Sequence, residues 1–190
     1  MNYDFFTPIQ DSVVAHILSQ SPAVLGRNIS LHTAENGFPN IGGMDIAILG
    51  VKDGRGAENN FGCGNDLQHI RKKLYQLFPG KWQAKIVDLG NIEKGNTVKD
   101  TYFAVSSSVE FLLKKNILPI IIGGSQDITY ANYRGYDALE QTVNLVSVDS
   151  RFDFGSIDDE MSSKSFLSKV IMEQPNNLFN YSNIGYQTYF

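Results

Sequence analysis

Two short hydrophobic runs, each followed at once by a cluster of small and polar residues, constrain the fold of this chain most. The runs span residues 118–122 and 143–148, and the clusters are Gly123-Gly124-Ser125-Gln126-Asp127 and Asp149-Ser150-Arg151-Phe152-Asp153. Short apolar runs rich in β-branched residues and bounded by glycine or polar residues are typical of buried strands in a parallel sheet. Such sheets place their chemistry just beyond the carboxyl ends of their strands, so both clusters fall where a site is expected.

The rest of the chain alternates between strand and helix patterns. Further strands are predicted at 45–51 and 85–90, with another beginning within 181–186, and helices at 67–78, 97–116, 127–140 and 163–173. This order predicts the α/β class with a mainly parallel sheet covered on both faces. Residues 1–40 are less regular, with a short helix at 13–18, and are interpreted as a leader packed on a single domain spanning 1–190, whose regular part is 44–190.

Composition excludes several classes of partner. The formal charge is -4 and the basic residues are scattered, which argues against a nucleic-acid partner. No apolar run approaches the roughly 20 residues that cross a bilayer, so no membrane association is predicted. The single cysteine, Cys63, excludes an intrachain disulfide and a cysteine-based zinc site. A free thiol and an N-terminus without a basic signal region together predict a cytoplasmic protein.

A glycine-containing loop, 50–56, offers a nucleotide-binding alternative. Its spacing is Gly-x3-Gly-x-Gly, which does not match the dinucleotide fingerprint, and Asp88 lies beyond the usual interval for the ribose-binding acid. A flexible loop at the sheet edge is the favoured interpretation. The three histidines, at positions 16, 32 and 69, lack ligand spacing. Cys63 is interpreted as a packing residue, and Ser125 lacks the Gly-x-Ser-x-Gly motif of a nucleophilic serine.

The clusters Gly123-Gly124-x-x-Asp127-Ile128 and Asp149-x-x-x-Asp153, taken with the first strand and Asp88-Leu89-Gly90, resemble the ureohydrolase family of arginase, agmatinase and formimidoylglutamase. The resemblance covers Met44 to Gly185 and is greatest to formimidoylglutamase-type members. It implies a three-layer α/β/α fold and a site for two manganese ions, whose bridging hydroxide attacks a guanidinium or formimino carbon. By position, Asp149 would bridge the metals and Asp153 would bind one of them.

Two substitutions depart from the family pattern. Gln126 and Arg151 occupy the positions of two metal-binding histidines, and an amide is a poor ligand for manganese while arginine has no lone pair to offer. The family's remaining ligands belong to a later Asp-x-Asp segment. We therefore expect a catalytically impaired homologue that does not bind manganese, with Arg151 neutralising the two aspartates. The alternatives are a manganese-dependent hydrolase of linear amidines, such as formimidoylglutamate, arginine or agmatine, and ordinary solvent-facing loop residues.

The resemblance also predicts an incomplete sheet, because later strands of the family insert between the strands that correspond to 118–122 and 143–148. Either these two strands pair directly here or their edges are completed by another copy. Unpaired hydrophobic edges invite association. A homo-oligomer, or a piece of a longer chain lacking its C-terminal segment, is therefore expected.

Overall fold

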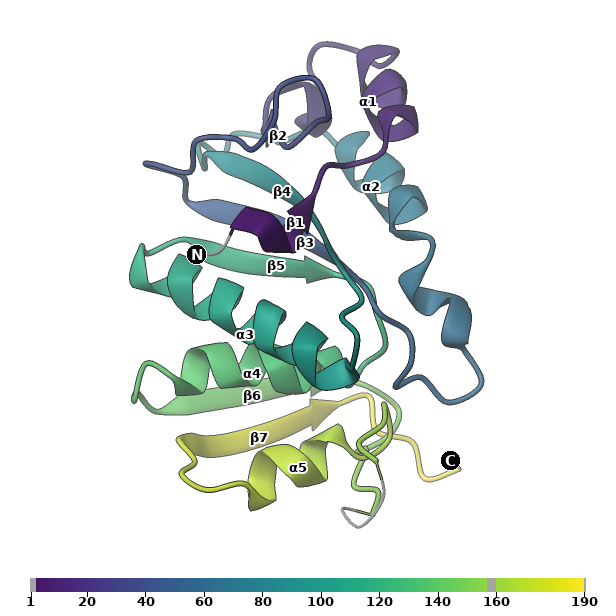
Figure 1. The fold of residues 1–190 in the computed structure, drawn as a ribbon, viewed down its shortest axis with the longest axis vertical. Coiled ribbons are helices and arrows are strands. Elements are labelled where there is room, and N and C mark those ends of the chain that lie inside the picture. The colour runs from purple at the N-terminus through teal and green to yellow at the C-terminus, as the bar shows by residue number, and fades with distance from the viewer. Residues whose placement is uncertain (1–2, 157–159, 190) are drawn as a thin grey trace.

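Helices and strands alternate along most of the computed structural model, which describes residues 3–156 and 160–189 (Figure 1). The strands are β1 (Phe6–Thr7), β2 (Ser30–Leu31), β3 (Ile46–Lys52), β4 (Ile86–Glu93), β5 (Leu118–Ile122), β6 (Val143–Val148) and β7 (Leu178–Ile184). The α-helices are α1 (Asp11–Leu18), α2 (Leu67–Tyr75), α3 (Val98–Lys114), α4 (Ile128–Asp137) and α5 (Phe166–Met172). The predicted α/β class is confirmed, and the bounds of β5 and β6 are those expected from their hydrophobic runs.

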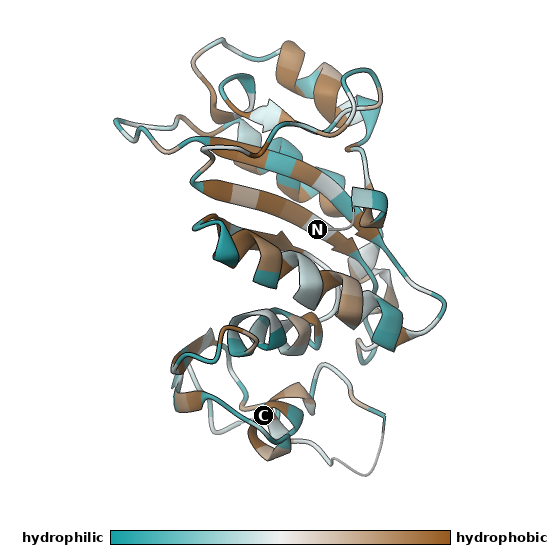
Figure 2. Ribbon diagram, turned by 60° about the vertical axis from the view of Figure 1, so that its left-hand side comes forward, coloured by the Kyte–Doolittle hydropathy of each residue, from teal (hydrophilic) through white to brown (hydrophobic). Residues whose placement is uncertain are grey.

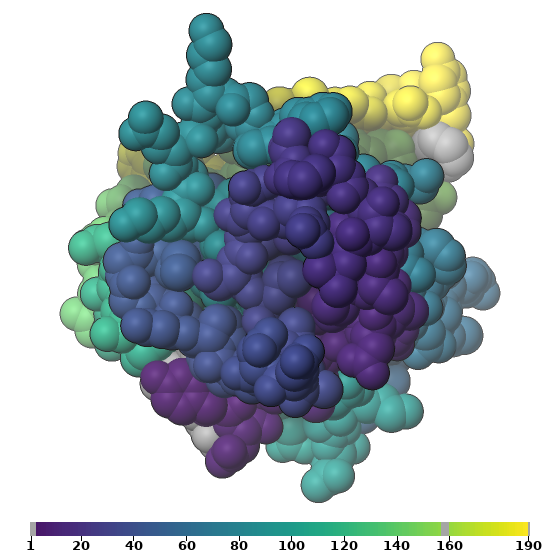
Figure 3. Space-filling model, turned by 90° about the horizontal axis from the view of Figure 1, so that it is seen from above, coloured from purple at the N-terminus to yellow at the C-terminus, as the bar shows by residue number. Residues whose placement is uncertain are grey.

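The main sheet has the order β1-β4-β3-β5, and β2 also pairs with β4. β2, β3, β4 and β5 are parallel, with Ile48 of β3 opposite Asp88 on one side and Ile120 on the other, whereas β1 is antiparallel. The leader predicted over 1–40 therefore contributes two edge strands that the sequence did not indicate, since two-residue strands carry no periodic pattern. Figure 3 shows this segment, in purple and blue, covering one end of the molecule.

Helices lie on both faces of the main sheet, which confirms the predicted three-layer arrangement. On one face, buried residues of α3 pack against Ala47, Leu49 and Val87. On the other, buried residues of α1 and α2 pack against Ile48 and Ile122. The brown stretches along these strands in Figure 2 mark their apolar residues. No helix in the described part of the chain has the length and hydropathy needed to cross a membrane.

Strands β6 and β7 form a separate two-stranded parallel sheet, and neither pairs with β5. Direct pairing of β5 with β6, one of the two alternatives, therefore does not occur, and the ribbons of α3 and α4 lie between them in Figure 1. The expectation that both strands are buried on both faces is also wrong. Leu118 is 51% exposed, Val146 59% and Val148 81%. Only Ile122, at the carboxyl end of β5, reaches the cluster formed with α1 and α2, and on β6 only Val143 and Leu145 pack against the cluster that includes α5.

Helix α3 is fixed at its first turn by a capping box. The Thr97 side chain accepts a hydrogen bond from the Asp100 backbone N–H, and the Asp100 carboxylate accepts one from the Thr97 N–H at 2.7 Å. The helix then buries Val105, Val109 and Leu112, at helical spacing, against the sheet. Its first turns consequently carry Thr101 and Tyr102 to the carboxyl edge of the strands.

Candidate functional site

The loops that follow β3, β5 and β6 meet at the carboxyl edge of the strands. The Ser125 backbone N–H donates to the Asp53 carbonyl at 3.0 Å, joining the loops after β5 and β3. The Gln126 Nε2 donates to Asp149 Oδ2 at 2.5 Å, joining the loops after β5 and β6. The two polar clusters singled out in the sequence are therefore brought together, although their strands lie in separate sheets.

The turn after β5 depends on two adjacent glycines. Gly123 and Gly124 have φ of +74° and +79°, a region that side chains with a Cβ rarely adopt. A Cβ on Gly123 would lie 1.9 Å from Leu67 Cδ2, so this glycine also lets α2 approach β5. Ser125 is buried at the start of the cluster, where its hydroxyl lies 3.4 Å from the Asp53 carbonyl oxygen. These contacts give Gly123, Gly124 and Ser125 the role of shaping the turn.

Asp127 points into the protein and not toward Asp149. Its side chain is 1% exposed, and its Oδ2 accepts a hydrogen bond from the Tyr102 hydroxyl at 2.5 Å. The loop after β3 packs closely on it, since a Cβ on Gly56 would lie 2.3 Å from Asp127 Cγ. Its Oδ1 has no hydrogen-bond partner among the described residues. Burial and the Asp127 hydrogen bond raise the pKa of Tyr102 well above its usual value, so the phenol remains a donor.

Asp149 and Asp153 occupy the loop after β6. Besides Gln126, Asp149 is contacted by the Arg151 backbone N–H, which donates to its Oδ1 at 3.1 Å. Burial and the charge of Asp149 raise the pKa of Asp153 to about 6, while the cations Arg151 and Lys164 act in the opposite direction. Two negatively charged carboxylates that repel each other in this way need a positive counter-charge, or one of them must hold a proton.

The side chains at this edge do not fit the two-manganese site that the resemblance implies. Within residues 3–156 and 160–189, no group of three or more His, Cys, Asp or Glu side chains is arranged to hold a metal ion. Gln126 directs its amide nitrogen, a hydrogen-bond donor, at Asp149, and Arg151 has no lone pair. The histidines lie elsewhere: His16 beside Gln76, His32 beside the Leu89 carbonyl and His69 beside Asp66.

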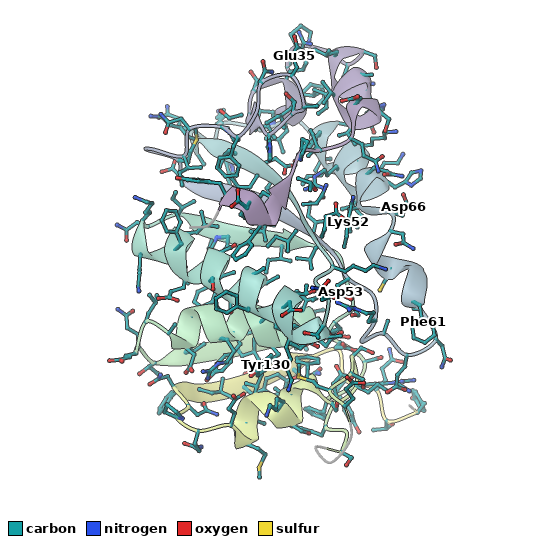
Figure 4. All side chains as sticks on the ribbon, in the orientation of Figure 1. Glu35, Lys52, Asp53, Phe61, Asp66 and Tyr130 are labelled. Carbon is teal, nitrogen blue, oxygen red and sulfur yellow. The ribbon has the colours of Figure 1, made fainter. Side chains whose placement is uncertain are left out.

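A buried ionic network around Asp53 belongs to the same edge and was missed in the sequence, where Asp53 was only part of a glycine loop. Arg55 donates to Asp53 from Nη2 at 2.7 Å and from Nε at 3.0 Å, and Thr101 Oγ1 donates at 2.7 Å. Burial alone would raise the pKa of Asp53, but these hydrogen bonds outweigh burial and lower it. Figure 4 shows Asp53 beside the first turn of α3. An acid two residues after the first predicted strand was the signal available.

Asp88 and Cys63, two residues weighed in the sequence analysis, lie in surroundings that indicate structural roles. Asp88, the acid weighed for a nucleotide site, is fully buried and forms an ion pair with Arg71, so it is not available to a ribose. Cys63 is half-buried beside Gly54, and burial raises the pKa of its thiol, which favours the protonated form over the nucleophilic thiolate. Both residues contribute to packing of the loops and helices next to the sheet.

Comparisons with known proteins agree on one family. A sequence model described as the arginase family matches residues 44–189. The formimidoylglutamase of Streptococcus gordonii is 23% identical over 156 residues, which are 76% of this chain and 47% of that protein. The formimidoylglutamase of Macrococcus caseolyticus is 29% identical over 137 residues, which are 69% of this chain and 43% of that protein.

Solved structures show the same fold. The crystal structure of Trypanosoma cruzi formiminoglutamase with Mn2+ superposes with a TM-score of 0.67 and 21% identity, covering 83% of this chain and 56% of that one. The formimidoylglutamase of Bacillus subtilis gives a TM-score of 0.67 and 15% identity, covering 85% of this chain and 54% of that one. The chain thus spans about half the length of the relatives that it matches.

Proposed function

Because this chain belongs to the arginase family, we propose that it is a formimidoylglutamase-like homologue whose metal site does not support hydrolysis. The contact from Gln126 Nε2 to Asp149 Oδ2, at 2.5 Å, carries the proposal. At these two positions the resemblance implies a histidine and a bridging carboxylate that both bind metal. Here an amide N–H donor engages the carboxylate directly, so one of its oxygens is already used.

The charges at the site support the same proposal. Arg151 donates its backbone N–H to Asp149, and its positive charge acts to lower the pKa of Asp153. A cation whose charge acts on these carboxylates supplies counter-charge that metal ions would otherwise provide, and it opposes the approach of a divalent cation. In this proposal Arg151 and Gln126 together stabilise the pair of aspartates as a metal-free polar site.

Manganese content of the purified protein tests the proposal. We expect far less than one manganese ion per chain after incubation with manganese chloride and desalting, measured by plasma mass spectrometry. The double variant Gln126→His with Arg151→His should bind more manganese than the unaltered chain, because it restores two imidazole ligands beside Asp149 and Asp153. The matched control, Gln126→Ala with Arg151→Ala, removes the same two side chains without adding ligands and should not gain manganese.

The second candidate function is a manganese-dependent hydrolase of linear amidines, which the retained Asp149 and Asp153 favour. Formamide release from formimidoylglutamate, or urea release from arginine or agmatine, distinguishes the two functions. Stoichiometric manganese together with manganese-dependent release by the unaltered chain would overturn the proposed impairment.

The unpaired strands support a proposal about assembly. Among the described residues nothing pairs with the second edge of β5 or of β6, and Leu118, Ile120, Val146 and Val148 are exposed on these strands. We propose that further strands, from a second copy or from the remainder of a longer chain, complete these edges. Amide hydrogen exchange and light scattering on this 190-residue chain test completion by a second copy. Slow amide exchange across residues 118–122 in an oligomer would support such completion, whereas fast exchange across these residues in a monomer would refute it. We also propose a cytoplasmic location, on the single free thiol.

A further inference from the structure

A cavity of about 680 Å³ lies among helices α3, α4 and α5, and neither Asp149 nor Asp153 lines it. Its walls come from one side of each helix and from residues 160–161. Volumes of a few hundred to a thousand Å³ are usual for sites that take small molecules. The site proposed above does not include this cavity, so any function of the cavity must be inferred separately.

One wall of the cavity is aromatic and apolar. The rings of Tyr102 and Tyr130 meet edge to face, with centroids 5.7 Å apart, and Ala131 and Met161 lie alongside. Phe103 also lines the cavity and is 65% exposed, which is unusual for so large an apolar side chain. Figure 4 shows Tyr130 on α4, between the ribbons of α3 and α5. This wall offers an aromatic or aliphatic body a surface to bury against.

Three of the five charged groups that line the cavity are cations. Lys99 of α3, Arg134 of α4 and Lys169 of α5 all border the cavity. Neither lysine forms an ion pair within residues 3–156 and 160–189, while Arg134 uses Nη1 to contact Asp137 at 2.7 Å. Of the two lining acids, Glu173 already accepts a hydrogen bond from the Tyr130 hydroxyl at 2.5 Å, and Glu160 is exposed. Three cations from three helices therefore converge around an aromatic wall.

From this arrangement we propose that the cavity binds a small amphipathic anion, with a carboxylate or sulfonate at the cations and an aromatic body against Tyr130 and Phe103. Charge-assisted hydrogen bonds from lysine and arginine suit such an anion. The aromatic wall supplies the rest of the affinity, and it selects against small inorganic anions, which cannot bury an apolar surface. The proposal does not depend on the state of the metal site, because Gln126, Asp149 and Asp153 are not among the residues that line the cavity.

The probe for this test is 1-naphthaleneacetate, titrated into the full ¹⁵N-labelled chain and followed by amide chemical shifts. We expect saturable binding with Kd of about 0.1–1 mM, as a ligand of this size allows. The shifted amides should lie in α3, α4 and α5. The neutral analogue 1-naphthaleneacetamide, which has the same rings without the charge, should bind at least about 5-fold more weakly.

Two charge reversals and one control locate the site. Lys169→Glu and Lys99→Glu, both at exposed positions, should each raise the Kd for 1-naphthaleneacetate about 5-fold. Lys81→Glu makes the same charge change in a loop outside the cavity and should leave the Kd unchanged. The proposal is overturned by shifts confined to the exposed faces of β5 and β6, by equal binding of the acid and the amide, or by a Kd that neither cavity variant alters.

Discussion

Replacing Arg71 with methionine should destabilise this protein severely, because it leaves the Asp88 carboxylate buried without its cation. Arg71 on α2 and Asp88 on β4 are 2% and 0% exposed. Arg71 donates to Asp88 from Nε at 2.7 Å and from Nη2 at 3.1 Å. It also donates to the Gly90 carbonyl at 2.8 Å and to Asn91 Oδ1 at 2.6 Å. One guanidinium therefore satisfies three acceptor groups on the same strand.

The magnitude follows from what Arg71→Met leaves behind. Asp88 keeps its hydrogen bonds from the Tyr75 hydroxyl and from the Gly90 N–H, which is 2.8 Å away, but loses its only ion-pair partner within the described residues. Breaking a buried pair in this way costs about 3–5 kcal/mol, whereas replacing both partners by well-packed apolar residues is often nearly neutral, and asparagine in place of Asp88 meets that condition only in part. We therefore expect Arg71→Met to lose about 4 kcal/mol, and the addition of Asp88→Asn to recover about 2 kcal/mol of it.

Urea unfolding followed by circular dichroism measures these differences. Fluorescence is a poor reporter here, because the only tryptophan, Trp82, is 82% exposed in the native chain. Lys72→Met on the same helix is the matched control and should change stability by less than about 0.5 kcal/mol. A loss below about 1 kcal/mol for Arg71→Met, or no recovery in the double variant with Asp88→Asn, would refute the reasoning.

Two further predictions concern the carboxyl edge of the strands. The fold raises the pKa of Asp153 from its ordinary value of 3.8 to about 6. Ionisation of Asp153 therefore destabilises the folded protein above about pH 6, and the effect disappears below about pH 4, where the carboxyl is protonated in both states. Asparagine tolerates the φ of +52° at this position. Asp153→Asn should therefore raise the free energy of unfolding by about 1 kcal/mol near pH 7.5, a value reduced to allow for screening of the charge by solvent, and should leave it unchanged near pH 4. A gain of equal size at both pH values would contradict this assignment. Gly123→Ala should lower the free energy of unfolding, measured in urea, by about 2 kcal/mol or more. The new Cβ would clash with Leu67, and alanine would have to adopt an unfavourable positive φ. Gly37→Ala has a similar φ of +69° with open space around it, and should cost only about 1 kcal/mol; equal losses would show that contact with Leu67 is unimportant.

Local patterns in the sequence were sufficient for most of the elements. The runs at 118–122 and 143–148 became β5 and β6 with the expected bounds, since a short, mainly apolar run rich in β-branched residues and flanked by glycine or polar residues has few alternatives. Strands β1 and β2 were missed because two residues carry no periodicity. Strand β7 begins at Leu178, several residues before the predicted position, because polar Asn180 and Ser182 conceal its start.

The sequence by itself determined which residues could form a site: two polar clusters, each directly after a strand, with Gln126 and Arg151 at positions where the resemblance implies histidines. Only the tertiary structure decided how they meet. Gln126 contacts Asp149 across 23 positions in the chain, and Arg71 contacts Asp88 across 17. It also decided that β5 and β6 do not pair with each other but join β3 and β7 in separate sheets. The physical reason is that strand and helix patterns reflect neighbours in sequence, whereas strand pairing and buried charge pairs depend on which segments fold onto one another.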